Sequence, residues 1–151
     1  MSGQIPPAVN TEYLEALYAR FLDDVTKVQE KTTTGDRLSG WFTRSRKFDP
    51  LQERFAEDME NAMKALYESG PDSQTVKDVL LYVYTKHVQV SKNHPSYLMI
   101  LAVHRYTMDL IGLLDPKDAA DLLEIYQLRL PKKEQMPVNT EVAKLLKKQA
   151  K

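Results

Sequence analysis

The chain of 151 residues contains no cysteine, which excludes disulfides, thiol catalysis and thiolate metal sites. It has only five glycines and three histidines, and its 21 basic side chains balance its 21 acidic ones. Because the formal net charge is zero, no overall field favours nucleic acid or an anionic membrane as a partner. The first residues lack the basic and apolar regions of a signal peptide, so we expect a cytoplasmic protein.

Sequence motifs for catalysis are missing as well. The chain has no Gly-x-Ser-x-Gly elbow, no phosphate-binding loop and no dinucleotide fingerprint. None of the histidines follows a glutamate by three residues, as a di-metal carboxylate bundle would require. We therefore predict no catalytic residue, no metal and no other cofactor, and the sequence favours a protein that is not an enzyme.

The sequence does contain strong helical periodicity. Apolar residues recur at spacings of three and four along most of the chain, and the low glycine content also favours helix. We predict an all-α single-domain helical bundle over residues 10–151, with five main helices and a short C-terminal one, after an extended leader at 1–9. The expected helices are 11–31, 49–69, 73–93, 96–114, 116–130 and 140–149, and a long loop is expected at 32–48.

The most apolar stretch of the chain runs from Tyr97 to Leu114. Its polar residues are His104, Arg105, Thr107 and Asp109. A helix that is hydrophobic on nearly every side must be buried by its neighbours. We therefore expect the helix at 96–114 to be the central element of the bundle. The stretch is at the short limit for a membrane span and carries charges, so no membrane association is expected.

Tyrosines and histidines are concentrated in the helices around this central element. The short turn at 93–95 makes helices 73–93 and 96–114 antiparallel neighbours, which places Tyr84 roughly opposite His104. We expect His104 to be a core histidine with the Tyr84 hydroxyl as its hydrogen-bond partner. The alternative is a small-ligand-binding protein or an enzyme with a pocket lined by Tyr84, His87, His104 and Tyr126.

A second candidate site is the predicted loop 32–48, in which basic residues surround two aromatic ones. These residues are Arg37, Trp41, Phe42, Arg44, Arg46 and Lys47. Arginines beside aromatic rings can hold phosphate, stack on bases or anchor a protein partner. The same residues could instead cover the end of the bundle, with the arginines paired to carboxylates of the next helix.

Charge is unevenly distributed along the chain. Residues 49–72 are mainly acidic, whereas residues 129–151 are mainly basic. Such asymmetry can steer self-association or the approach of a partner. We therefore predict a non-enzymatic adaptor or regulatory protein that acts through protein–protein contacts, with another protein or a second copy as its partner. Phosphate or nucleic-acid binding through loop 32–48 and a tyrosine-lined ligand pocket are the alternatives.

Overall fold

The computed structural model describes residues 9–32 and 40–151, and the side chains among them except those of 30–32 and 40–48. All regular elements of this described part are helical, which confirms the predicted all-α class. None of the described helices is long and apolar enough to cross a membrane. The elements are α1 (Thr11–Thr32), α2 (Gly40–Glu68), α3 (Ser73–Thr85), η1 (Lys86–Gln89), α4 (Tyr97–Ala102), η2 (Val103–Thr107), α5 (Met108–Ile111), α6 (Pro116–Arg129), η3 (Lys132–Glu134) and α7 (Pro137–Gln149), where η marks a 3-10 turn.

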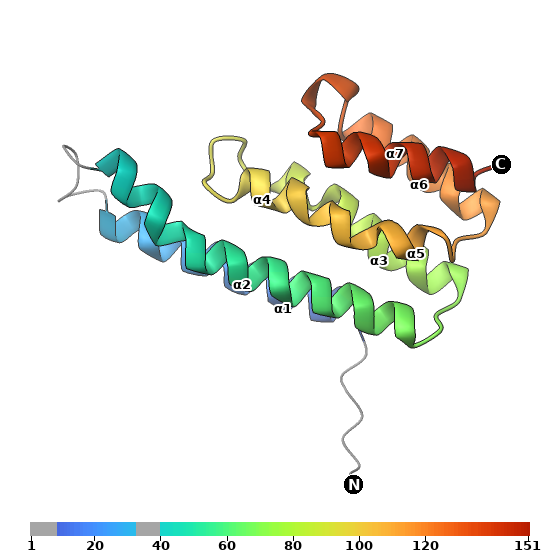
Figure 1. Cartoon of the computed structure of the whole chain (residues 1–151), viewed down its shortest axis with the longest axis horizontal. Helices are drawn as coiled ribbons and strands as arrows, with labels where there is room; N and C mark the ends of the chain where they lie inside the picture. Colours follow the sequence, from blue (N-terminus) through green and yellow to red (C-terminus); the bar gives the residue numbers. More distant parts are fainter. Residues whose placement is uncertain (1–8, 33–39) are drawn as a thin grey trace, which may run out of the picture.

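The helices form three hairpins that stand side by side in a row (Figure 1). α1 pairs with α2, α3 pairs with the segment α4–η2–α5, and α6 pairs with α7. α2, α4–α5 and α7 form the nearer layer in Figure 1, and α1, α3 and α6 lie behind them. Because each hairpin packs on its neighbour, the central hairpin is covered on both sides, whereas within the described residues each outer hairpin is covered on one side only.

The first hairpin is held by the buried apolar faces of its two helices. The Asn10 side-chain oxygen accepts the Tyr13 amide at 2.9 Å and thereby caps α1. Phe21 of α1 stacks on Phe55 of α2 with ring centroids 4.2 Å apart. Gly70 follows α2 with a φ of 66°, a left-handed conformation that glycine adopts without strain.

α2 begins earlier than predicted. The predicted helix start at residue 49 is wrong, because α2 begins at Gly40 and continues through Pro50. The predicted loop 32–48 is therefore also wrong from residue 40 onward. An interior proline removes one backbone hydrogen bond and costs about 3 kcal/mol, so the sequence favoured a helix start there. The proline φ of about −65° nevertheless suits a helix, so a helix can continue through it.

The stretch predicted as one central helix lies between α2 and α7, as expected for the central element, but it is not one continuous α-helix. The tighter turn η2 separates α4 from α5. Within it, the Thr107 hydroxyl donates to the His104 carbonyl oxygen at 2.7 Å. Threonine side chains that bond to nearby carbonyls compete with regular helix geometry. The helix predicted at 73–93 likewise ends at Thr85, whose hydroxyl donates to the Leu81 carbonyl at 2.7 Å, and continues as η1.

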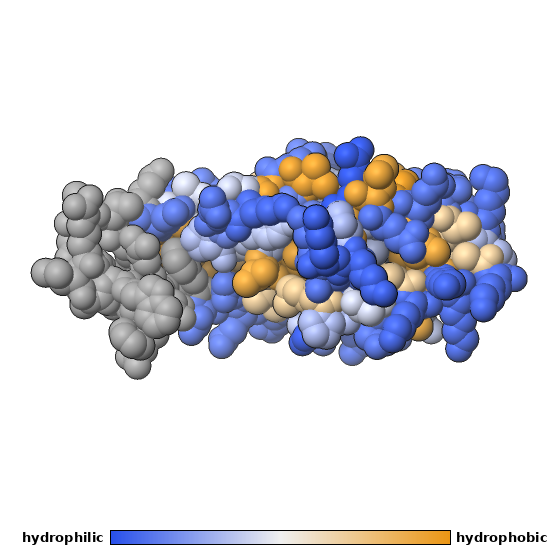
Figure 2. Space-filling view, turned by 90° about the horizontal axis from the view of Figure 1, so that it is seen from above, coloured by the Kyte–Doolittle hydropathy of each residue, from blue (hydrophilic) through white to orange (hydrophobic). Residues whose placement is uncertain are grey.

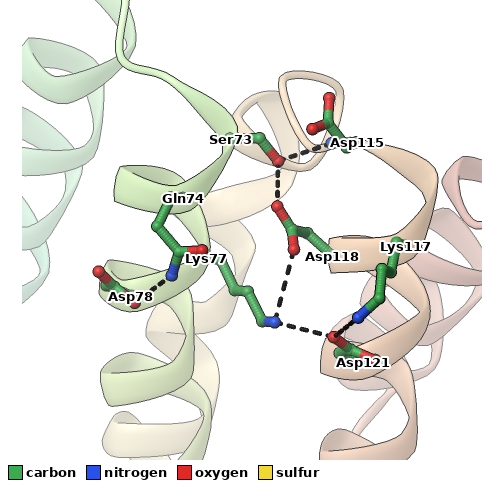
Figure 3. A network of polar contacts seen from close by, with 8 residues as sticks. All are labelled: Ser73, Gln74, Lys77, Asp78, Asp115, Lys117, Asp118 and Asp121. Atoms are coloured by element: carbon green, nitrogen blue, oxygen red, sulfur yellow. Dashed lines mark hydrogen bonds and ion pairs between the residues drawn. The ribbon is translucent and has the colours of Figure 1, made fainter.

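A polar network joins α3 of the second hairpin to α6 of the third (Figure 3). The Ser73 hydroxyl donates to Asp118 Oδ2 at 2.6 Å and accepts the Asp115 amide at 2.7 Å. Lys77 Nζ lies 2.8 Å from Asp121 Oδ2 and 3.4 Å from Asp118 Oδ1. α6 begins at Pro116, as predicted, but the preceding Asp115 side chain makes no capping hydrogen bond.

α7 begins three residues before the predicted start at 140. Pro137 is the first helical residue, where its missing N–H group costs nothing. Asn139 lies inside the first turn of α7. Its Oδ1 accepts the Met136 amide at 3.0 Å. This position leaves the Asn139 amide nitrogen free to bond within the core.

Candidate functional site

The structure brings the predicted pocket residues together, but packs them against one another. The Tyr84 ring centroid lies 4.8 Å from that of Tyr126 and 5.2 Å from that of His104. The His87 ring centroid lies 6.4 Å from that of His104. All four side chains are buried. Their rings pack together between α3, η1, η2 and α6, so these residues belong to the buried core.

The hydrogen bonds of His104 define its protonation state. Its Nε2 lies 3.2 Å from the Val83 carbonyl oxygen, which can only accept, so Nε2 carries the proton. Nδ1 therefore accepts from the Tyr126 hydroxyl at 2.8 Å, and the Tyr126 oxygen accepts from Asn139 Nδ2 at 3.0 Å. Burial lowers the pKa of His104 to about 3, with the nearby His87 as a second cause. The ring is therefore neutral.

The predicted hydrogen bond between Tyr84 and His104 is wrong. Tyr84 donates instead to Thr107 Oγ1 at 2.6 Å, because the Thr107 proton is already donated to the His104 carbonyl. Burial raises the pKa of Tyr84. The prediction assumed that residues 96–114 form one continuous α-helix, but the 3-10 turn η2 changes the direction of the side chains that follow it. The side chain that hydrogen-bonds to His104 is Tyr126 of α6.

His87 lies at the edge of this cluster and connects two hairpins. Its Nε2 donates to the Arg129 carbonyl oxygen at the end of α6, at 2.8 Å. Its buried Nδ1 has no hydrogen-bond partner among the described residues. Across residues 9–32 and 40–151, no three histidine, aspartate or glutamate side chains gather closely enough to hold a metal ion.

The second predicted site lies outside the side chains that the structure describes. Arg37 is outside the described residues. Trp41 and the four residues predicted with it lie in the first turns of α2, where the backbone alone is described. Phosphate, nucleic-acid or partner binding by this group stays a prediction.

A surface groove of about 600 Å³ lies between α2 and the η2–α5 segment. Both of its walls belong to the nearer layer in Figure 1. It extends from Glu60 to Glu68 along α2, which corresponds to ~12 Å, or about two helical turns. The lining residues are Glu60, Met63, Lys64, Tyr67 and Glu68 of α2, with Arg105, Tyr106, Met108, Asp109 and Leu110 on the opposite wall.

The floor of this groove is apolar. Met63 and Leu110 are buried, and Met108 is partly buried. Methionine side chains adapt readily to the shape of a partner. Tyr67 at the rim is 46% exposed, although it is a large aromatic side chain. An exposed tyrosine beside buried methionines is the type of residue that anchors protein interfaces.

Charged side chains form the rim. They are three acids and two bases: Glu60, Glu68, Asp109, Lys64 and Arg105. All five are exposed, and none of them makes an ion pair within the described part of the chain. These charges therefore remain available to a binding partner.

The groove was not predicted from the sequence, because its walls come from two segments far apart in the chain. Only the packing of α2 on η2 and α5 brings the walls together. Two features of the sequence could have indicated the groove. Tyr67 lies outside the apolar stripe of its helix, and Arg105 and Asp109 form a polar stripe on the otherwise apolar central stretch.

Comparison with known proteins gives no relative for this chain: no family model, no curated protein and no solved structure matches it. The groove has an apolar floor and a rim with both acidic and basic side chains. This combination is suited to binding an amphipathic segment of a protein chain.

Proposed function

We propose that this protein is a non-enzymatic helical adaptor that holds a short segment of another protein in the groove between α2 and α5. The observation that carries the proposal is the combination of an apolar floor with five exposed rim charges that have no ion-pair partner in the described part of the chain. Protein interfaces commonly combine an apolar centre with a polar rim.

The groove also indicates what the partner segment carries. Its length suits about two turns of an amphipathic helix, a common form of peptide recognition by helical proteins. Apolar side chains of that segment would contact Met63, Met108 and Tyr67. Glu60 and Glu68 on one wall would attract basic groups, and Arg105 on the other would attract an acidic one. We therefore expect a partner with apolar anchors flanked by charges of both signs.

Site-specific photo-crosslinking tests this proposal. A photoreactive phenylalanine analogue is placed at Tyr67 in the groove or, as the control, at Leu98, which is 65% exposed and does not line the groove. We expect a defined covalent adduct in cells from position 67 and not from position 98. Arg105→Glu should abolish that adduct, because it reverses a rim charge without touching the core.

The mass of the adduct identifies the partner. An adduct of twice the chain mass indicates a second copy, and sedimentation should then depend on protein concentration. Adducts of equal yield from positions 67 and 98, or adducts unaffected by Arg105→Glu, would contradict binding in the groove.

A further inference from the structure

A second hollow, of about 390 Å³, lies between α6, η3 and α7. These elements belong to the third hairpin, at the upper end of the row in Figure 1. Figure 2 looks onto this side, where hydrophilic residues gather around smaller apolar areas. The hollow is thus separate from the α2–α5 groove, which belongs to the first and second hairpins.

The charged residues that line this hollow are all positive. They are Lys132 from η3 and Lys144 and Lys147 from α7. Lys132 and Lys147 make no ion pair within residues 9–32 and 40–151. Lys144 lies 4.0 Å from Glu141 Oε1, and both side chains are exposed, so this contact contributes little. The hollow therefore concentrates positive charge, whereas the α2–α5 groove is lined by both acidic and basic side chains.

Neutral polar groups complete the lining. The Thr140 hydroxyl donates to Gln135 Oε1 at 3.3 Å, and Gln135 Nε2 donates to the Leu130 carbonyl at 3.0 Å. These bonds connect Gln135, directly after η3, to α7 and to the end of α6. The amide of Gln127 adds a donor from α6. The Thr140 proton is used within this network, so the neutral donors are the Gln127 amide and the second proton of Gln135 Nε2. Lysine ammonium groups beside such donors are typical ligands of phosphate oxygens.

We propose that this hollow binds a phosphate-bearing ligand, a compact and multiply charged anion held by the three lysines. Its volume lies within the range of small-ligand sites, about 300–1,000 Å³. No aromatic side chain lines it, so a nucleic-acid base has nothing there to stack on, and the phosphate is the recognised group. A free phosphorylated small molecule and a phospholipid headgroup share this chemistry.

Titration of the full-length ¹⁵N-labelled protein with inorganic pyrophosphate tests the site. We expect saturable shifts of the backbone amides of Thr140, Lys144 and Lys147. Lys147→Glu should weaken binding about tenfold or more, because it replaces one charge-assisted contact by a repulsion. Circular dichroism of the variant checks that this exposed substitution leaves the fold intact.

Lys148→Glu is the matched control. Lys148 lies in the same last turn of α7 and is exposed, but it does not line the hollow. The change in net charge is identical, so affinity should stay within about twofold if the hollow is the site. Equal weakening by both variants would overturn the proposal, since it would indicate a diffuse charge effect.

A second arm measures co-sedimentation with phosphatidylcholine vesicles that contain phosphatidylinositol 4,5-bisphosphate. Pyrophosphate binding without vesicle binding identifies a free phosphorylated molecule. Vesicle binding that depends on Lys147 but not on Lys148, without pyrophosphate binding, identifies a headgroup. The absence of Lys147-dependent binding in both arms would overturn the proposal.

Discussion

Acidification from pH 8 to pH 5 should destabilise this protein through His104. The neutral ring is fully buried, and its pKa is about 3 in the folded protein. In the unfolded chain the pKa returns to about 6.5. Between these two values the unfolded state binds a proton that the folded state does not bind, so the free energy of unfolding decreases as the pH falls below about 6.5.

The size of this effect follows from how far the pH lies below the pKa of the unfolded chain. Each pH unit below that pKa lowers the free energy of unfolding by about 1.4 kcal/mol, so the free energy of unfolding at pH 5 is about 2 kcal/mol lower than at pH 8. A loss of this size is a large fraction of the stability of a small domain, which is about 5–15 kcal/mol.

His104→Gln isolates the contribution of this one group. A glutamine can still donate to the Val83 carbonyl and accept from the Tyr126 hydroxyl, but it does not titrate. Urea unfolding of both proteins at pH 8 and pH 5 measures the difference. The original chain should lose about 2 kcal/mol more than the variant between these pH values. Equal losses would refute the reasoning.

His94 provides the control. Its partly buried ring also has a lowered pKa, but it remains closer to solvent, so His94→Gln should change the pH dependence of stability less than His104→Gln does.

NMR of the unsubstituted protein tests the neutral state of His104 without any variant. The His104 imidazole should keep its chemical shifts from pH 8 to pH 5, with the proton on Nε2. A titration midpoint between these values for every histidine would be incompatible with the buried neutral ring.

Three further predictions concern the stability of the fold, each measured as the free energy of unfolding in urea. Ile100→Ala should cost about 2–5 kcal/mol, because Ile100 is fully buried in the central stretch, whereas Leu98→Ala at an exposed position should cost less than about 0.5 kcal/mol. Gly70→Ala should cost about 1 kcal/mol through its φ of 66° alone, since an added Cβ meets no atom within 4 Å. Asp72→Ala should cost about 1 kcal/mol, because the Asp72 side chain accepts the Thr75 amide at the start of α3.

Much of the fold could be predicted because its signals are local. Leu14, Leu17 and Phe21 have helical spacing and are buried, and Asn10 caps α1, a position for which asparagine is a preferred residue type. The apolar stretch at 96–114 has too few polar residues to lie at the surface, which fixed its central position. These properties depend on neighbours within one or two helical turns.

Helix boundaries were less predictable where a local preference opposes continuation. Pro50 favours a helix start, but α2 runs through it, and Thr107 lies in a tighter turn within an otherwise helical stretch. At such positions the local preference amounts to a few kcal/mol, which packing of the rest of the helix can exceed. Sequence spacing carries no measure of that packing.

Contacts between helices were the least predictable. The sequence placed His104 in the core and grouped it with Tyr126, but it did not give Tyr126 as the hydrogen-bond partner of His104 or Asn139 as part of the network. It also did not reveal the groove between α2 and α5. Helix periodicity specifies which face of a helix is buried. It leaves open the rotation and offset of one helix against another, and shifts of a few ångströms decide which polar groups meet. The helices and their buried faces therefore follow from local sequence. The His104 network and the α2–α5 groove arise from the way the three hairpins stack, and the basic hollow arises from the packing of η3 and α7 beside α6.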